Sequence, residues 1–203
     1  MRPLFCLLLL PLSPCSAQVE VIAGDAASGL VSEPFSVDFD PQGVLHGVEF
    51  TKSNRIFRVV DGRVEFVAGV PHNAETQKPG PGVEVHDGAD PMKAVFNGMH
   101  DIQITSGGVA IIGDSFHHRV RRMDLQTGAV STLAGTDKGF GGDGGPAAQA
   151  KFNITMTACL SPDEKRVYIA DIGNHRTRMI DLATGIVSTV AGNGSKERPT
   201  DGD

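Results

Sequence analysis

Histidine is the residue type in this sequence best suited to bind a metal ion or to transfer a proton. The seven histidines do not form the closely spaced pairs of a helical zinc motif. His100 stands out because it begins an apolar segment beside Asp101, and Asp114 ends the next apolar segment. We expect His100, Asp101 and Asp114 to offer polar contacts to a ligand. His117 and His118, beside Asp114, are a further candidate metal pair, although solvated loop histidines are the more common outcome.

Two acidic, glycine-containing loops form the second candidate site. Asp87 lies in HDGADP at 86–91 and Asp143 in GFGGDGGP at 139–146, and each aspartate precedes a phenylalanine by nine residues. Such loops supply the carboxylate and carbonyl oxygens that Ca²⁺ prefers. The longer loop lacks the Gly-Lys-Ser/Thr ending of a phosphate-binding loop. Recurrence at one spacing favours a structural turn, and metal binding by Asp87 and Asp143, or by His100, is the alternative.

The elements that would position these residues repeat along the chain. Apolar strands end in Ala-Gly three times, and the alanine follows an arginine by 13, 15 and 15 residues, at Arg55 to Ala68, Arg119 to Ala134 and Arg176 to Ala191. The distance from each Ala-Gly to the next arginine-bearing turn varies much more. A constant core with insertions on one side is typical of a repeat array.

Each repeat contains four apolar runs rich in β-branched residues and bounded by Gly, Asp, Asn and Pro. The first two runs lead to an acidic residue, and a polar turn follows it. We expect third strands at 55–60, 120–125 and 177–182 and fourth strands at 63–68, 129–134 and 186–191. The unit is thus a four-stranded antiparallel meander of roughly 40 to 60 residues, the size of a propeller blade.

The segments DIGNHRTRMIDLATGIVSTVAGNG at 171–194 and GFGGDGGPAAQAKF at 139–152 closely resemble the NHL repeat. The resemblance covers the chain after residue 18 and is strongest in the third copy. It implies an all-β fold, a partial NHL-type β-propeller of about three to four blades made of four antiparallel strands. The expected blade units are about 24–69, 70–135 and 136–192, with the start of a further blade at 193–203. The family's turn falls on residues that we expect to be structural: Asp171, Asn174, His175 and Arg176.

The resemblance also implies one possible chemistry. Some similar propeller lyases, which release amides from peptidyl-hydroxyglycine, bind zinc through histidines near the axis, one from each of several blades. The positions equivalent to His100, counted from the acidic residues, are Phe35 and Thr157. A three-histidine site is therefore not expected from this chain alone. No cofactor is predicted, and Ca²⁺ or Zn²⁺ belongs to the metal-dependent alternative.

The repeat arginines have two interpretations. The first is strand-edge packing and pairing with Asp124 or Asp181, and the second is a ligand-binding patch. The first is favoured because one such turn recurs in each repeat. The residues concerned are Arg119, Arg121, Arg122, Arg176 and Arg178.

The first 17 residues resemble a secretory signal. Arg2 precedes the apolar run 4–12, and small residues precede an expected cleavage after Ala17. The run is too short to span a bilayer. A lipoprotein anchor on Cys15 is the less favoured alternative, because Pro14 occupies the preceding position. We expect a secreted or periplasmic protein with one remaining cysteine, Cys159, buried in an apolar strand.

The formal net charge of −6 argues against nucleic acid or an anionic membrane as the main partner, since both attract a dense basic face. NHL propellers usually have six blades, and 203 residues supply about half that number. We therefore expect either a product shortened from a longer gene or self-association of open propeller edges.

The sequence favours a non-catalytic, extracytoplasmic binding scaffold for a protein or carbohydrate ligand. The variable segments 70–90 and 136–150 both join one blade's last strand to the next blade's first strand, so they lie at one rim. The alternative is a metal-dependent lyase or lactonase-like enzyme with His100 as one ligand.

Overall fold

The computed structural model describes residues 31–51, 53–71 and 85–197. The expected signal peptide with Cys15 lies outside these residues. So does the last part of the segment 193–203. The remaining chain contains the three repeats that carry the candidate sites.

The described residues form three four-stranded antiparallel sheets, each built from consecutive strands. Blade 1 comprises β1 (Pro34–Phe39), β2 (Leu45–Glu49), β3 (Ile56–Val60) and β4 (Arg63–Ala68). Blade 2 comprises β5 (Met99–Ile104), β6 (Val109–Asp114), β7 (Arg119–Asp124) and β8 (Val130–Ala134). Blade 3 comprises β9 (Thr155–Leu160), β10 (Arg166–Asp171), β11 (Arg176–Asp181) and β12 (Ile186–Ala191).

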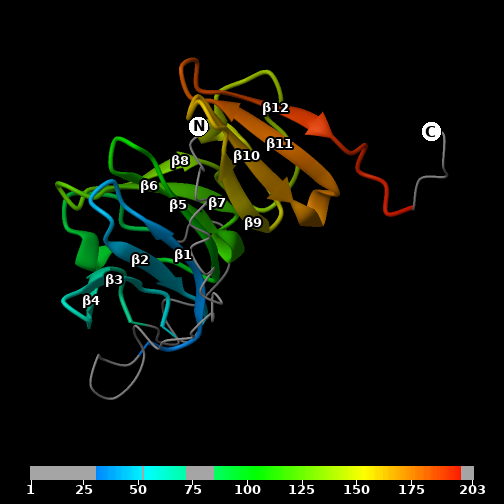
Figure 1. Ribbon diagram of the computed structural model, residues 1–203. Helices are drawn as coiled ribbons and strands as arrows, with labels where there is room; N and C mark the ends of the chain where they lie inside the picture. Colours follow the sequence, from blue (N-terminus) through cyan, green and yellow to red (C-terminus); the bar gives the residue numbers. More distant parts are fainter. Residues whose placement is uncertain (1–30, 52, 72–84, 198–203) are drawn as a thin grey trace, which may run out of the picture.

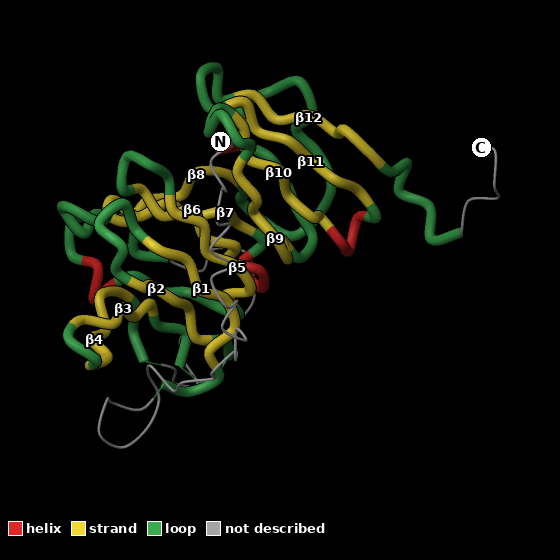
Figure 2. Tube along the Cα trace, viewed as in Figure 1, coloured by secondary structure: helices red, strands yellow, loops and turns green. Residues whose placement is uncertain are grey.

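Four short 3-10 helices lie in the connections, within the described ranges. Two of them, η1 (Pro91–Lys93) and η3 (Ala147–Gln149), precede the first strand of a blade. The other two, η2 (Ser115–His117) and η4 (Ile172–Asn174), follow the second strand. Figure 2 shows these helices as short interruptions in loops between the strands.

The three sheets follow one another in chain order around the first strands, with β5 in contact with both β1 and β9 (Figure 1). The apolar core lies between the blades. One cluster joins blades 1 and 2 through residues such as Ile56 and Ile102, and a second joins blades 2 and 3 through residues such as Val120 and Ala158. The prediction of a partial all-β propeller with four-stranded antiparallel blades is confirmed.

The repeated Ala-Gly has a local structural cause. Gly69, Gly135 and Gly192 all have positive φ, at 99°, 95° and 82°. A Cβ on each would strike a backbone carbonyl oxygen of the turn before the third strand. Only glycine fits a position with both constraints. The close approach of the last strand to this turn explains the near-constant distance between the arginine and Ala-Gly.

The strand boundaries correct the sequence alignment at one point. The third strands begin at Ile56, Arg119 and Arg176, each one residue from the expected start. In blade 3 the turn between β9 and β10 is one residue longer than its counterpart in blade 2. The register therefore pairs Thr155 with Asp171, as Met99 pairs with Asp114. The position equivalent to His100 is consequently Met156, not Thr157.

The expectation that Cys159 is buried is wrong. Its strand has alternating faces, and Ala158 is buried while Cys159 is exposed. The prediction relied on the apolar neighbours Ala158 and Leu160, whose side chains point to the opposite face of β9 from Cys159. Among the described residues, no helix is long and apolar enough to cross a membrane.

Candidate ligand-binding site

An aromatic cluster surrounds His100 at the junction of blades 1 and 2. The His100 ring lies 4.7 Å from Phe35, 4.5 Å from Phe50 and 5.8 Å from Phe116, measured between centroids, and all three contacts are edge-on. Phe50 also packs at 5.2 Å from Phe35 and 5.9 Å from Phe116. These distances and tilted arrangements are those that aromatic pairs prefer. We call these four residues the aromatic cluster.

The aromatic cluster remains partly open to solvent. Phe35 is 53% exposed, and the other three residues are half-buried. Phe35 and His100 lie at the starts of β1 and β5, Phe50 lies directly after β2, and Phe116 lies in η2, which follows β6. All four are therefore at the rim where the variable connections enter the blades. Partly exposed aromatic groups at such a rim are typical of interaction sites.

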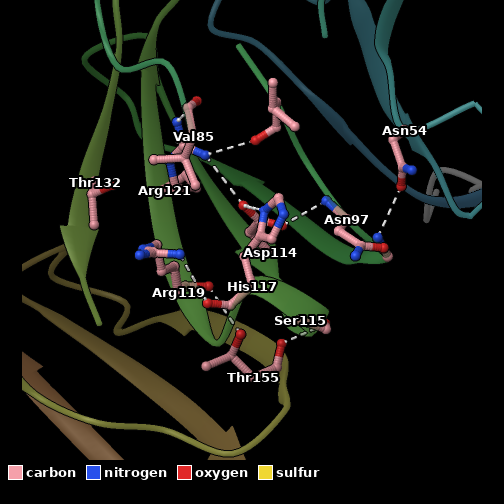
Figure 3. Close-up of polar contacts among 12 residues, drawn as sticks. Asn54, Val85, Asn97, Asp114, Ser115, His117, Arg119, Arg121, Thr132 and Thr155 are labelled. Carbon is pink, nitrogen blue, oxygen red and sulfur yellow. Dashed lines mark hydrogen bonds and ion pairs between the residues drawn. The ribbon is translucent and has the colours of Figure 1, made fainter. Parts of the chain in front are cut away.

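Hydrogen bonds determine the tautomer of His100. Its Nδ1 lies 3.0 Å from the carbonyl oxygen of Gly98 and 2.7 Å from Ser115 Oγ. The Ser115 hydroxyl donates to the carbonyl oxygen of Thr155 at 2.7 Å (Figure 3), so Nδ1 must carry the proton that it shares with these acceptors. Burial lowers the pKa of His100, only partly offset by the bond to Gly98. The ring is thus neutral at neutral pH and presents the lone pair of Nε2.

A glycine makes the aromatic cluster possible. Gly98 has φ of 65°, and the Phe116 ring lies where a Cβ would project, with its Cγ at 3.1 Å. The segment after Asp114 forms η2, which turns Ser115 toward His100 and Phe116 over Gly98. A side chain at position 98 would displace the Phe116 ring from the cluster.

Asp101 joins three blades rather than facing open solvent. Its carboxylate accepts a hydrogen bond from Ser36 Oγ at 3.1 Å and from the backbone amide of Ala158 at 3.1 Å. The residue is 9% exposed. Its observed contacts therefore align the first strands β1, β5 and β9.

Asp114 is fully buried in a polar network (Figure 3). It accepts hydrogen bonds from the Asn97 amide at 2.8 Å, from His117 Nδ1 at 3.0 Å and from Arg121 Nη1 at 3.2 Å. Burial alone would raise the pKa of Asp114, but the charges of His117 and Arg121 and these hydrogen bonds outweigh it, so the pKa lies below its ordinary value. A ligand at the surface does not reach this carboxylate.

His117 is buried as well, and the expectation of a solvated loop histidine is wrong for it. It is 3% exposed and bonded to Asp114. His118 is half-buried, and its Nδ1 accepts a hydrogen bond from the amide of Ile154 in the next blade at 3.0 Å. The two histidines therefore hold turns and blades together instead of forming a pair.

The two acidic loops are anchored by buried arginines. Arg121 bonds to Asp87 at 2.6 Å and to the Val85 carbonyl oxygen at 3.1 Å, in addition to Asp114. Arg178 repeats the arrangement in blade 3, with Asp143 at 2.7 Å and Asp171 at 3.4 Å. Both arginines are completely buried.

The expected partners of these arginines were therefore wrong. Asp124 and Asp181 instead accept hydrogen bonds from backbone amides in the turns that follow them. Asp124 and Asp181 are close in sequence to Arg121 and Arg178. They are the last residues of β7 and β11, however, and lie where each strand enters the following turn. The carboxylates of Asp87 and Asp143 are occupied by guanidinium groups, and the described residues contain no group of three or more potential metal-binding side chains.

The family turn in blade 3 makes local contacts. Asn174 Nδ2 donates to Asp171 and to the Gly139 carbonyl oxygen, the latter at 2.6 Å. Arg176 donates to the Asn193 carbonyl oxygen and lies 3.9 Å from the Phe140 ring centroid. His175 is exposed at the chain turn, with φ of 52°. Burial raises the pKa of Asp171, and hydrogen bonds from Asn174 and the Asn153 amide offset this only in part.

Zinc binding by three histidines is not supported by the described residues. His100 would provide one imidazole nitrogen, and the protonated Nδ1 on a carbonyl oxygen is an arrangement that suits a metal-binding histidine. The equivalent positions in the other two blades are Phe35 and Met156, neither of which offers a nitrogen ligand. Sequence reasoning missed Phe50 and Phe116, which a search for aromatic residues within two positions after each second strand would have found.

No protein-family model matches the chain. A segment of 77 residues, 38% of the chain, is 32% identical to NHL repeat-containing protein 2 of Gallus gallus, and it spans 11% of that protein. The corresponding match in the Homo sapiens protein is 29% identical over 79 residues. These matches, together with the three four-stranded blades, support an NHL-repeat β-propeller. Its NHL matches span about a tenth of the length of these relatives.

Solved structures show the same fold. A protein of unknown function from Bacteroides thetaiotaomicron matches with a TM-score of 0.53 at 24% identity, covering 68% of this chain and 32% of the other. A chain of the nidogen/laminin complex matches with a TM-score of 0.53 at 11% identity, covering 79% and 48%. Both likenesses concern the propeller architecture alone.

Proposed function

We propose that this chain is an extracytoplasmic NHL-type binding scaffold that holds a protein or carbohydrate ligand at the aromatic cluster. The observation that carries the proposal is the neutral His100 ring, with its Nε2 lone pair, inside a half-exposed group of three phenylalanines. Such a surface suits a ligand that combines an apolar face with a hydrogen-bond donor.

The geometry supports a glycan better than an anionic ligand. A sugar ring presents an apolar face to aromatic side chains and hydroxyl donors to an acceptor such as Nε2. The overall charge of −6 disfavours acidic ligands. Export is proposed from the apolar segment 4–12 and the small residues before Gln18.

The experiment is a titration of the purified protein with a panel of neutral oligosaccharides, followed by saturation-transfer NMR. We expect binding to be lost or weakened at least tenfold in His100→Ala and Phe116→Ala, the loss of about 1.4 kcal/mol. Arg122→Ala, an exposed change in β7 outside the cluster, is the matched control. Equal binding by all three variants would contradict the proposed site.

Metal analysis distinguishes the binding scaffold from the alternative, a metal-dependent lyase or lactonase-like enzyme. Under the scaffold proposal, purified protein dialysed against Zn²⁺ or Ca²⁺ retains no stoichiometric metal, and His100→Ala does not change the metal content. Retention of one Zn²⁺ that depends on His100 would favour the enzyme instead.

A further inference from the structure

A cavity of about 350 Å³ opens on the outer side of blade 3. It lies at the turn before β11 and at the end of β12. We call it the blade 3 socket. Its lining residues are Ala170, Ile172, His175, Arg176, Thr177, Ala191 and Gly192.

The equivalent position in blade 2 is filled by the next blade. The residue before β9 and the first residue of β9 each donate to this position, from the Ile154 amide to His118 Nδ1 at 3.0 Å and from Thr155 Oγ1 to the Arg119 carbonyl oxygen at 2.9 Å. Ser115 completes the contact by donating to the Thr155 carbonyl oxygen (Figure 3). His118 and Arg119 correspond to His175 and Arg176 of the blade 3 socket.

Blade 1 shows the same contact with different side chains. The Gly98 amide, which leads into β5, donates to Asn54 Oδ1 at 2.8 Å (Figure 3). Asn54 occupies the position of His118 and His175. Two junctions of the same molecule therefore show which kind of segment occupies such a socket: the residues just before the first strand of a blade.

Exposure separates the filled positions from the open one. Ala68 and Ala134 are completely buried, whereas Ala191 at the same position is exposed. Cys159 and Thr157 are exposed on this side as well. In blade 2 their counterparts, Gln103 and Asp101, accept hydrogen bonds from the first strand of the next blade.

The opposite face of the molecule is complementary. Val37 and Phe39 of β1 are 53% and 59% exposed. Val37 and Phe39 correspond to Ile102 and Ile104 of β5, which pack against the preceding blade. Blade 1 thus presents the apolar stripe that a socket-bearing blade covers at the other junctions.

The backbone before β1 has the shape that the socket receives. Glu33 has φ of 53°, beside 65° for both Gly98 and Ile154. The Glu33 carbonyl oxygen accepts the Phe50 amide, as the Ile154 carbonyl oxygen accepts the Ile172 amide. The residues leading into β1 therefore repeat the conformation of the two segments that already fill sockets.

We propose that the blade 3 socket binds blade 1 of a second copy of this chain. Residues 32–34 of one copy enter the socket of the other, and the stripe formed by Val37 and Phe39 covers the exposed side of β9. A two-fold pair satisfies both sockets and both stripes at once, because the described part of each copy offers one of each. The interface continues the blade-to-blade packing already present between β1, β5 and β9.

Disulfide trapping tests the contact directly. In the pair, position 39 of one copy lies beside Cys159 of the other, as the Leu160 backbone amide lies beside the Gln103 side chain within the chain, at 3.4 Å from Oε1. Mild oxidation of Phe39→Cys is expected to give a covalent species of twice the chain mass in denaturing gels, with Cys159 in the cross-linked peptide by mass spectrometry. Thr184→Cys, in an exposed turn of blade 3, is the matched control and is expected to stay monomeric.

Light scattering on the unmodified protein provides the second measurement. We expect a dimer that Ala191→Arg converts to a folded monomer, while Thr184→Arg, which adds the same charge in an exposed turn, leaves the dimer intact. A folded monomer for the unmodified protein at all concentrations would overturn the proposal. A ladder of larger cross-linked species would overturn the two-fold arrangement. A dimer that persists in the Ala191→Arg variant would overturn the proposal that the blade 3 socket forms the contact.

Discussion

Blades 1 and 2 share a backbone but stabilise it with different chemistry. In blade 2 a buried guanidinium, Arg121, lies between Asp114 and Asp87. At the same position blade 1 has Phe57, which packs over Gly47, and Glu49 pairs with the partly exposed Arg55. The comparison teaches that the acidic residue at the end of the second strand, Glu49 or Asp114, is paired with a cation in both blades. The buried position in the third strand accepts either a guanidinium group or an aromatic ring.

The largest effect is expected from removing the buried cation of blade 2. Arg121→Met leaves Asp114 buried without its guanidinium and releases Asp87, and we expect a loss of about 3–5 kcal/mol in the free energy of unfolding. Urea denaturation followed by circular dichroism measures it. Arg122→Ala, one residue along the strand and exposed, should change stability by less than about 0.5 kcal/mol. A similar small loss for Arg121→Met would mean that blade 2 does not depend on its ion pair.

The aromatic arrangement of blade 1 is tested at Gly47. A Cβ there would lie 2.8 Å from Phe57 Cε1 and 3.0 Å from Val37 Cγ1. Gly47→Ala is therefore expected to cost about 1–3 kcal/mol through overpacking. Gly107→Ala is the control, because its nearest neighbour is 3.8 Å away. Thermal unfolding of the two variants compares them, and equal melting temperatures would show that Phe57 moves freely.

Blades 2 and 3 differ in the residue beside the buried aspartate. His117 helps to lower the pKa of Asp114, whereas Asn174 occupies that place beside Asp171, whose pKa burial raises. A carboxylate with a depressed pKa stabilises the fold above its ordinary value near 4 and loses this contribution as the pH falls through the folded value.

Exchanging these two residues should move acid unfolding in opposite directions. His117→Asn raises the pKa of Asp114, so the midpoint moves to higher pH, with a loss at neutral pH of about 0.5–1.5 kcal/mol. Asn174→His should lower the pKa of Asp171 and move the midpoint to lower pH. Far-ultraviolet circular dichroism, recorded from pH 2 to 7, about the range in which carboxylates titrate, gives the pH midpoint of acid unfolding for each variant. Shifts in the same direction would refute this account of the difference.

The smallest effect is expected for the exposed ion pair of blade 1. Arg58 and Glu65 lie 2.8 Å apart, with side chains 45% and 48% exposed. Glu65→Gln should cost about 0.2–1 kcal/mol, and less in 1 M salt, since exposed pairs are screened. Denaturation at low and high salt measures the difference. A loss as large as that of Arg121→Met would remove the contrast between exposed and buried pairs.

Much of the fold was predictable because its signals are local. Ala-Gly recurs where a strand crosses a carbonyl group, so its spacing identified the last strand of every repeat. The one-residue error at Met156 arose from a longer turn, which no local pattern in the strand reveals. Burial of Cys159 was mispredicted for a related reason: neighbours in sequence point to the other face of the strand.

The candidate site was predictable only in part. His100 was identified by its place before an apolar strand, but its aromatic neighbours come from two other segments and meet it through tertiary packing. The partners of Arg121 could not be read from the strand, because Asp87 lies 34 residues away in the connecting loop. Such pairs depend on how the loop folds back.

The two connections between blades are anchored differently. Asp87 secures the part of the first connection nearest blade 2, so a change of length before it need not move the strands. In the second connection the residues before Asp143 are fixed as well, because the Gly139 amide donates to Phe152 and the Gly141 carbonyl oxygen accepts from Arg178. Foreign sequence inserted in the first connection, between Val70 and Val85, should consequently be accommodated without refolding the neighbouring blades. The connection between blades 1 and 2 is thus a position where sequence can be added, by engineering or by evolution, while the blades keep their packing.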